Sequence, residues 1–237
     1  KYIECIAYQH SIIFPNQPSL LSPNDISTQP EKIFTSGLNG KNVLKSVYKK
    51  SKIYVIGNPR HKKKIVDFKR KKNICLLIPD GTIDESKKML ELIPKNKSLK
   101  NSNIEFVVRF HPGVSDFFLN NHNPNIKFSK NVLSEDLKNC SWAVYRGSGA
   151  IVHCLAHGIR PIYYSYDKND LSIDPIYNLK KFKKKIYSFK ELNKIIQHDI
   201  NNDFFYNHKT FIKEHSKKSN LYFSKINYPF AKKLILR

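Results

Sequence analysis

The stretch Trp-Ala-Val-Tyr-Arg-Gly-Ser-Gly-Ala, residues 142–150, decides the fold, because an apolar strand runs directly through a glycine-rich turn into a helix. We expect the strand over 142–145 and the helix over 150–157, with Gly158 as the residue that ends the helix. Such a turn aims backbone N–H groups and the Ser148 hydroxyl at one point, which suits a phosphate. An ordinary helix capped by Ser148 explains the same residues equally well.

The rest of the chain repeats this alternation of short apolar strands and helix-length mixed segments, which is typical of βα units around a parallel sheet. We predict an α/β fold with strands at 2–7, 32–35, 53–56, 74–78, 105–110, 126–128, 142–145 and 161–164. Helices are predicted at 41–49, 85–92, 134–140, 150–157 and 189–200, the third of them capped by Ser134.

The most basic polar stretch separates two predicted strands and marks a domain boundary. Residues 1–58 would be the C-terminal part of a first α/β domain that is truncated upstream, and residues 59–72 a basic linker. Residues 73–187 would form a Rossmann-like domain, followed by a helical C-terminal extension over 188–237.

The composition predicts a globular protein that attracts anions. The 237 residues include 42 Lys and Arg against 19 Asp and Glu, a net charge of +23. A Lys-rich and Asn-rich compositional bias explains this charge about as well as a partner does. The basic runs 60–64, 69–72 and 180–185 are expected to be solvated faces, with contact to an anionic membrane surface as the sharper alternative.

The four cysteines are far apart, and no stretch is apolar for the roughly 18 residues that a membrane span requires. A cytoplasmic protein is therefore expected, with peripheral contact to the inner face of the membrane as a further possibility.

Two more predicted strands end in turns that can carry chemistry. Pro79-Asp80-Gly81 follows the strand at 74–78, and Arg109-Phe110-His111-Pro112-Gly113 closes the strand at 105–110. Because ligands of open parallel sheets bind at the carboxyl ends of strands, these turns join the one at 146–150 as candidate site elements. Arg109 and His111 point to one face of the strand and would reach the same anion, unless Arg109 is held in a structural ion pair.

In this order the motifs Asp-Gly, Arg-x-His-Pro and Gly-Ser, followed by an apolar helix and Gly158, resemble the C-terminal half of GT-B transferases of bacterial surface carbohydrates. The His-Pro pair is similar to that of bacterial sialyltransferases and capsule Kdo transferases, and teichoic-acid polymerases carry a related Arg-x-His-Pro. The resemblance covers residues 73–177 well and the first 57 weakly. It departs from the family at Gly149, where a second Ser or Thr is usual, and at His153, where many UDP-sugar enzymes have Glu.

The resemblance implies that His111 and Ser148 hold the phosphate of a nucleotide sugar, assisted by the N–H groups of Gly149 and Ala150. Further residues are expected to contact the donor at the same site. Four lie in the same turns and one in a later segment: Arg109, Pro112, Arg146, Gly147 and Asp174. Asp174 is alternatively the start of a turn. No metal or cofactor is expected, because a basic site lacking clustered carboxylates suits a metal-independent mechanism.

Asp80 corresponds best to the acidic residue of the sialyltransferase motif and is the candidate general base, although Pro-Asp-Gly is also a common turn. His10 is the alternative base or acceptor contact. Trp142 and Tyr145 are expected in the core rather than against a base.

The resulting hypothesis is a glycosyltransferase that moves a sugar from a CMP-linked donor to a surface polysaccharide or a lipid-linked (glycolipid) acceptor. The alternatives are a CDP-glycerol-type phosphotransferase, a sugar epimerase on the same scaffold, and a non-catalytic polyanion-binding module. A specific nucleic-acid partner is not expected, because few aromatic residues are interleaved with the basic runs.

Overall fold

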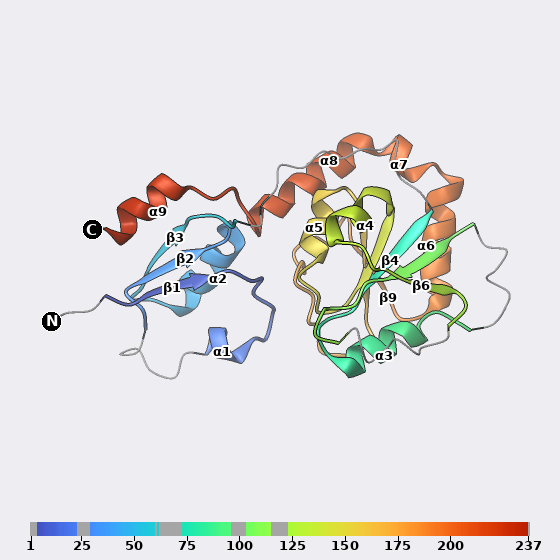
Figure 1. The fold of residues 1–237 in the computed structure, drawn as a ribbon, viewed down its shortest axis with the longest axis horizontal. Helices are drawn as coiled ribbons and strands as arrows, with labels where there is room; N and C mark the ends of the chain where they lie inside the picture. Colours follow the sequence, from blue (N-terminus) through green and yellow to red (C-terminus); the bar gives the residue numbers. More distant parts are fainter. Residues whose placement is uncertain are drawn as a thin grey trace. The chain divides into compact units, whose positions relative to one another are not determined.

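The computed structural model describes residues 4–22, 29–59, 61, 73–95, 103–114 and 123–236 (Figure 1). The chain forms two compact units. Unit 1 consists of residues 1–64 and 217–237, and unit 2 consists of residues 65–216.

Unit 1 is built on a three-stranded parallel sheet in the order β1-β2-β3 (Ile6–Gln9, Lys32–Thr35 and Lys52–Val55). Its helical elements are α1 (Pro18–Leu21), α2 (Leu38–Val47), the 3-10 helix η4 (Lys218–Leu221) and α9 (Tyr228–Ile235). Alternation along β2 divides the core, because Ile33 packs with Leu44 of α2 on one face while Phe34 packs with Ala231 of α9 on the other.

Unit 2 contains a six-stranded sheet in which every neighbouring pair is parallel. The strand order is β6-β5-β4-β7-β8-β9. The strands are β4 (Ile74–Ile78), β5 (Glu105–Val108), β6 (Ile126–Phe128), β7 (Trp142–Tyr145), β8 (Arg160–Tyr164) and β9 (Lys184–Ile186). This is the Rossmann order, and its direction reverses between β4 and β7.

Helices border both faces of this sheet. They are α3 (Ile83–Glu91), α4 (Leu133–Asn139), α5 (Ile151–Ala156), α6 (Phe189–Asn201), α7 (Phe204–Asn207) and α8 (Lys209–Lys217). Met89 of α3 and Leu192 of α6 share one core cluster with Leu77 and Val144 of the central strands. The opposite face includes Val107, which lines a pocket with residues of α4. A doubly wound α/β fold follows.

The predicted α/β class and parallel sheet are confirmed, and the strands predicted at 32–35, 74–78, 126–128 and 142–145 have the bounds found in the structure. The first strand lies at Ile6–Gln9 rather than 2–7. The core positions of Trp142 and Tyr145 are also confirmed, since both side chains are buried.

Three features differ from the sequence-based prediction. Helix α4 begins at Leu133 after Val132, so Ser134 lies inside the helix instead of capping it. Strand β9 was not predicted because Lys184 and Lys185 are exposed and only Ile186 is buried, a pattern that an edge strand tolerates. Residues 188–216 belong to unit 2 and residues 217–237 to unit 1, so the expected C-terminal extension is divided between two cores. The expected linker lies, apart from Pro59 and His61, outside the described residues.

Candidate functional site

The turns after β4, β5 and β7 open at the same edge of the unit 2 sheet. In the parallel register Leu77 pairs with Val108, and Ile78 pairs with Tyr145. The turns that follow carry Asp80, His111 and Ser148, so the expectation that these three residues share one strand-end edge is confirmed. This edge includes the reversal point between β4 and β7, where open α/β sheets bind ligands.

Two glycines let the three turns approach one another closely. A Cβ atom placed on Gly81 would lie 3.4 Å from Cγ of the His111 ring. At Gly147, φ is +68°, and a Cβ atom would lie 3.2 Å from Oδ2 of Asp80 and 2.8 Å from Cδ1 of Ile173. Only glycine fits this second position without strain. The glycine at 147 therefore serves the close contact with Asp80 as well as the turn.

His111 is exposed, and its ring is oriented by its own turn. The backbone N–H of Gly113 donates to Nδ1 of His111 over 3.2 Å. A neutral imidazole whose Nδ1 accepts a hydrogen bond carries its proton on Nε2. The ring therefore presents an N–H donor at the nitrogen that the turn leaves unused. Pro112, between the two residues, is also exposed.

Asp80 is fixed by the turn in which it lies. Its Oδ1 accepts hydrogen bonds from the backbone N–H and the Oγ1 hydroxyl of Thr82, both at 2.8 Å. This is the Asx-turn that a Pro-Asp-Gly sequence favours. The carboxylate keeps Oδ2 for another partner, and that oxygen is the one that lies against Gly147.

Ser148 does not cap the helix that follows it. Helix α5 has Ala150 as its N-cap residue, without a side-chain hydrogen bond. The Ser148 carbonyl accepts from the N–H of Ile151. Within the described part of the chain, no group accepts a hydrogen bond from the N–H groups of Ser148, Gly149 or Ala150. The alternative of an ordinary serine cap therefore does not describe this turn, whereas Gly158 does end α5 with φ of +68°.

Arg109 is held in a structural ion pair rather than beside His111. Its guanidinium contacts Asp136 of α4 at 3.1 Å and the carbonyl of Asn131. Asp136 is buried and also accepts from the Ser129 hydroxyl over 2.8 Å. Of the two possibilities that the sequence left open, the structure has the ion pair, because α4 brings a buried carboxylate to the end of β5.

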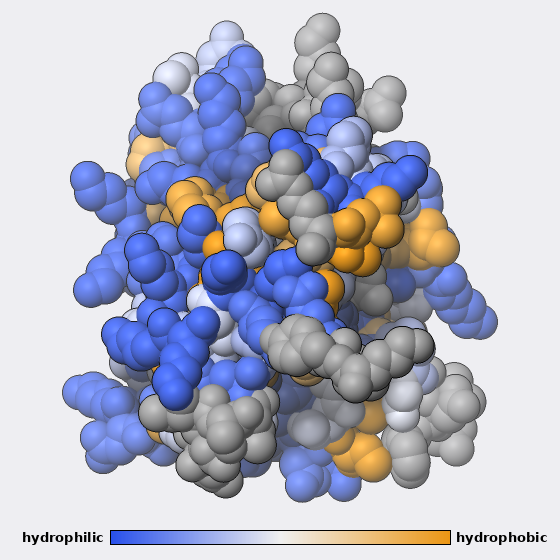
Figure 2. All heavy atoms as spheres, turned by 90° about the vertical axis from the view of Figure 1, so that its left-hand side faces the viewer, coloured by the Kyte–Doolittle hydropathy of each residue, from blue (hydrophilic) through white to orange (hydrophobic). Residues whose placement is uncertain are grey.

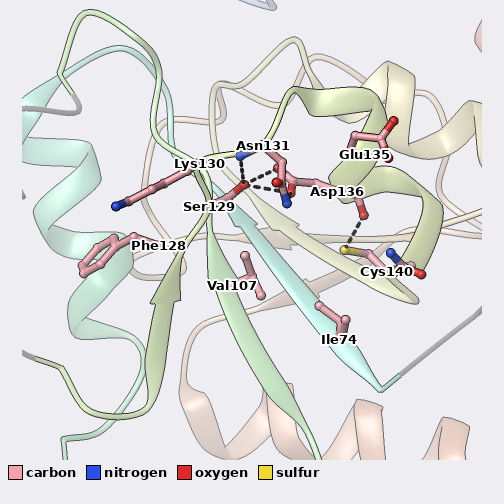
Figure 3. A pocket seen from close by; sticks show the side chains of 10 residues that line it. Ile74, Val107, Phe128, Ser129, Lys130, Asn131, Glu135, Asp136 and Cys140 are labelled. Atoms are coloured by element: carbon pink, nitrogen blue, oxygen red, sulfur yellow. Dashed lines mark hydrogen bonds between the residues drawn. The ribbon is translucent and has the colours of Figure 1, made fainter.

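A pocket of about 350 Å³ lies next to this ion pair, between α4 and one face of the sheet. Figure 3 shows Ser129, Asn131 and Asp136 joined by hydrogen bonds at one side of it, with Val107 and Ile74 on the strands below. None of Asp80, His111 and Ser148 lines this pocket. It is therefore separate from the edge where the three turns meet.

Arg146 is buried and fully committed to protein partners. Its side chain is 5% exposed and pairs with Glu85 of α3 at 2.9 Å and with Asp170 at 2.8 Å. It also donates to the Tyr163 hydroxyl over 2.8 Å, and its guanidinium lies 4.3 Å from the centre of the Tyr166 ring. Arg146 was expected to contact a ligand anion, but the two carboxylates already neutralise its charge.

These partners change the acid–base properties of the cluster. Burial disfavours the charged guanidinium of Arg146, yet its interactions with Tyr163, Glu85 and Asp170 outweigh burial and raise the pKa. For Tyr166, burial and its hydrogen bond to Glu85 raise the pKa of the phenol well above the ordinary value. Arg146 therefore stays protonated beside its two carboxylates, and the neighbouring Tyr163 and Tyr166 phenols keep their protons.

Asp174 is likewise buried and satisfied. It accepts hydrogen bonds from the Tyr145 hydroxyl over 2.8 Å and from the N–H of Ile176 over 3.0 Å, and it pairs with Lys183. Asp174 therefore fits the alternative of a residue that starts a turn better than that of a ligand for a sugar hydroxyl.

His10 lies in unit 1, at the end of β1. Its side chain is exposed, and its ring centre lies 6.5 Å from that of Tyr8. Both residues line a mainly apolar pocket of about 280 Å³ together with Leu20 and Leu44. His10 thus belongs to unit 1, whereas Asp80, His111 and Ser148 belong to unit 2.

Sequence reasoning missed the residues that organise the site. Glu85, Tyr163, Tyr166 and Asp170 surround Arg146 but belong to no recognisable motif. The available signal was Glu85, an acidic residue in the first turn of a helix that follows Asp-Gly. Within the described ranges, no three His, Cys, Asp or Glu residues gather as a metal site. No helix among these residues is long and apolar enough to cross a bilayer.

No family model matches the chain. No curated protein matches its sequence either.

Solved structures do match the fold. The glycosyltransferase SnogD from Streptomyces nogalater has a TM-score of 0.53 at 14% identity, over 86% of this chain and 56% of its own. The calicheamicin glycosyltransferase CalG4 has a TM-score of 0.53 at 8% identity, over 88% and 52%. The glycotransferase of kitacinnamycin has a TM-score of 0.51 at 13% identity, over 88% and 55%.

Identities this low show the fold alone. The α/β fold, with its six-stranded parallel sheet and smaller parallel sheet, is that of about half of a GT-B glycosyltransferase structure. The chain thus spans about half the length of the glycosyltransferases that it matches.

Proposed function

We propose that unit 2 binds the phosphate of a nucleotide sugar at the edge between β4 and β7, and that the protein is a glycosyltransferase. The observation that carries this proposal is the meeting of three turns at the reversal point of the sheet, with Asp80 against Gly147 and His111 against Gly81. Ligands of doubly wound sheets bind at this point, and the GT-B-like fold agrees with the assignment.

The donors at this edge suit a leaving phosphate. The Nε2–H group of His111, the Ser148 hydroxyl and the N–H groups of Gly149 and Ala150 supply hydrogen bonds to phosphate oxygens. Such fixed donors stabilise the charge that develops as the bond between sugar and phosphate breaks.

Asp80 is the proposed general base. Glycosyl transfer requires removal of a proton from the acceptor hydroxyl as the new bond forms. Thr82 holds one carboxylate oxygen of Asp80, so the other oxygen has a fixed direction from which it can accept that proton. His10 of unit 1 is the alternative base.

In this proposal Arg146, Arg109 and Asp174 do not contact the ligand but hold the turns of the site in place. Arg146 ties the turn after β7 to α3 and to the segment around Asp170, and Arg109 ties β5 to α4. Asp174 holds Tyr145, the last residue of β7. The buried side chains of Arg146 and Asp174 are fully paired, and Arg109 is held by Asp136, so their proposed role is to position the turns.

The proposed donor is CMP-linked and the proposed acceptor is a surface polysaccharide or a lipid-linked saccharide. Support for cytidine comes from the resemblance of His111-Pro112 to the motif of CMP-sugar enzymes and from His153 on α5, where many UDP-sugar enzymes carry Glu. We expect tighter binding of CMP or CDP than of UDP, as measured by titration calorimetry. Equal or stronger binding of UDP would instead assign a uridine nucleotide as the donor.

Substitution of His111 tests the site itself. A hydrogen bond to a charged partner contributes about 1.5–3 kcal/mol, so His111→Ala should weaken CMP binding about ten- to a hundredfold. Ser148→Ala should do less, because the N–H groups of Gly149 and Ala150 remain. The control is His198→Ala, since the His198 side chain is 70% exposed on α6.

Calorimetric affinity and melting temperature of the three variants separate the possibilities. The proposal requires a loss of affinity in His111→Ala at an unchanged melting temperature. If His111→Ala unfolds the protein, or binds CMP as well as His198→Ala does, His111 is a structural turn residue.

A further inference from the structure

Helix α9 of unit 1 packs onto the sheet through one of its sides. Ala231 is buried against Phe34 and Ile56, and Leu234 is partly buried in the same cluster. The Phe230 ring meets Tyr54 of β3 edge to face. These contacts attach the helix firmly and determine which of its residues face outward.

The outward side of α9 combines large apolar side chains with lysines. Tyr228 is 64% exposed, Ile235 is 54% exposed and Leu236, directly after the helix, is 72% exposed. Lys232 and Lys233 are exposed between them. Figure 2 shows one face of the molecule, on which hydrophobic side chains, in orange, gather in patches among hydrophilic ones, in blue. Exposed apolar residues that gather on one element mark an interaction surface.

Positive charge is concentrated in the unit that carries this helix. Unit 1 comprises residues 1–64 and 217–237, and its sequence has 17 Lys and Arg against three Asp and Glu. Its net charge of +14 is therefore more than half of the +23 of the whole chain. A surface with this charge attracts an anionic partner and repels a second copy of itself.

We propose that α9 is a docking helix that lies in the interface of an anionic lipid membrane. Aromatic and aliphatic side chains enter the boundary between headgroups and acyl chains, while neighbouring lysines contact anionic headgroups. Lysines alone would also bind nucleic acid or another polyanion, but Ile235 and Leu236 gain nothing from such a partner. The lysines favour lipid over an uncharged protein surface, and the net charge disfavours self-association.

The observations on α9 are independent of the nucleotide site in unit 2. Membrane docking would add a location, the membrane surface, to the proposed function. A lipid-linked acceptor is confined to a membrane surface, so a docked enzyme would meet it without diffusing through solution.

Vesicle sedimentation of the full chain tests the proposal. The probes are vesicles of phosphatidylcholine alone and vesicles of phosphatidylcholine with phosphatidylglycerol at about 2:1, at low and high salt. We expect binding to the anionic vesicles that weakens with salt, and little binding to phosphatidylcholine alone.

Two double variants separate the apolar contribution from the charged one. Ile235→Ser with Leu236→Ser should lower partitioning about tenfold or more, since burial of each aliphatic side chain is lost. Lys232→Gln with Lys233→Gln should lower it by about fivefold for each lysine. The matched controls lie in unit 2: Val132→Ser removes an exposed apolar side chain, and Lys180→Gln with Lys181→Gln removes the same charge.

The outcomes decide the assignment. Loss of vesicle binding in the α9 variants, with the unit 2 controls and CMP affinity unchanged, supports a lipid-docking helix. Equal losses in the α9 and unit 2 lysine variants would instead indicate diffuse charge attraction and overturn it. Self-association in sedimentation velocity that Ile235→Ser with Leu236→Ser abolishes, without vesicle binding by the wild type, would assign the face to a second copy.

Discussion

At the scale of single residues, Arg146 links more parts of the candidate site than any residue in the motifs. It follows β7 directly, and its guanidinium joins α3 through Glu85 and the segment after β8 through Asp170. The ion pairs of Arg146 therefore fix the position of the turn that contains Gly147 and Ser148. A buried charge of this kind is tolerable only while its partners are present.

Replacement of Arg146 should be costly for stability. Arg146→Met leaves Glu85 and Asp170 without their cation, and loss of one partner of a buried pair lowers the free energy of unfolding by about 3–5 kcal/mol. Urea unfolding measures this change. Lys127→Met is the control, because Lys127 and Glu105 form an exposed pair whose loss should cost less than about 1 kcal/mol. Equal effects of the two variants would show that the Arg146 cluster does not hold the turn.

At the scale of elements, the start of helix α6 is fixed by hydrogen bonds between residues close in sequence. Ser188 is its N-cap, and the Ser188 hydroxyl accepts from the N–H of Glu191 over 3.3 Å. The Glu191 carboxylate accepts in turn from the N–H of Tyr187 over 2.6 Å. This reciprocal arrangement fixes the start of the helix that covers one face of the sheet through Leu192 and Ile196.

Substitution of Ser188 and of Ser134, which both lie near helix starts, should affect stability differently. Ser188→Ala should lower the free energy of unfolding by about 1 kcal/mol, because the hydroxyl cap of α6 is lost. Ser134→Ala should leave it nearly unchanged, because Ser134 lies inside α4 and caps nothing. Chemical unfolding of both variants provides the comparison. A larger loss in Ser134→Ala would restore the cap that the sequence predicted.

At the scale of the whole molecule, three buried or partly buried phenols and one buried thiol of unit 2 predict a loss of stability in alkaline solution. Burial raises the pKa of the Tyr163, Tyr164 and Tyr166 phenols and of the Cys75 thiol. A raised pKa means that the folded protein keeps a proton that the unfolded chain releases. The stabilisation is thus complete below the ordinary values, about 8.5 for a thiol and 10 for a phenol, and declines as pH rises above them.

The urea midpoint should therefore fall as pH rises from about 8 to 11. Tyr164→Phe should reduce the steepness of this fall, because one partly buried titrating group with a raised pKa is removed. Tyr206→Phe is the control, as Tyr206 is 71% exposed on α7. A fall of the same steepness in wild type and Tyr164→Phe would mean that buried phenols do not cause it.

The sequence by itself determined the α/β class, most strands of the sheet and the three turns that close β4, β5 and β7. These features rest on short-range physics: apolar runs form strands, glycine permits a positive φ at 147 and 158, and Asp80 hydrogen-bonds two residues ahead. The edge shared by Asp80, His111 and Ser148 also followed from sequence, because parallel strands present their carboxyl ends together.

Only the tertiary structure decided which charged residues remain available for a ligand. Arg146 meets Glu85 across 61 positions of the chain and Asp170 across 24, and Arg109 meets Asp136 across 27. No periodicity or turn preference acts over such separations, because each partner is chosen by how strands and helices pack. The same reason explains why residues 217–237 join the core of unit 1, where Ala231 of α9 packs against Phe34 and Ile56.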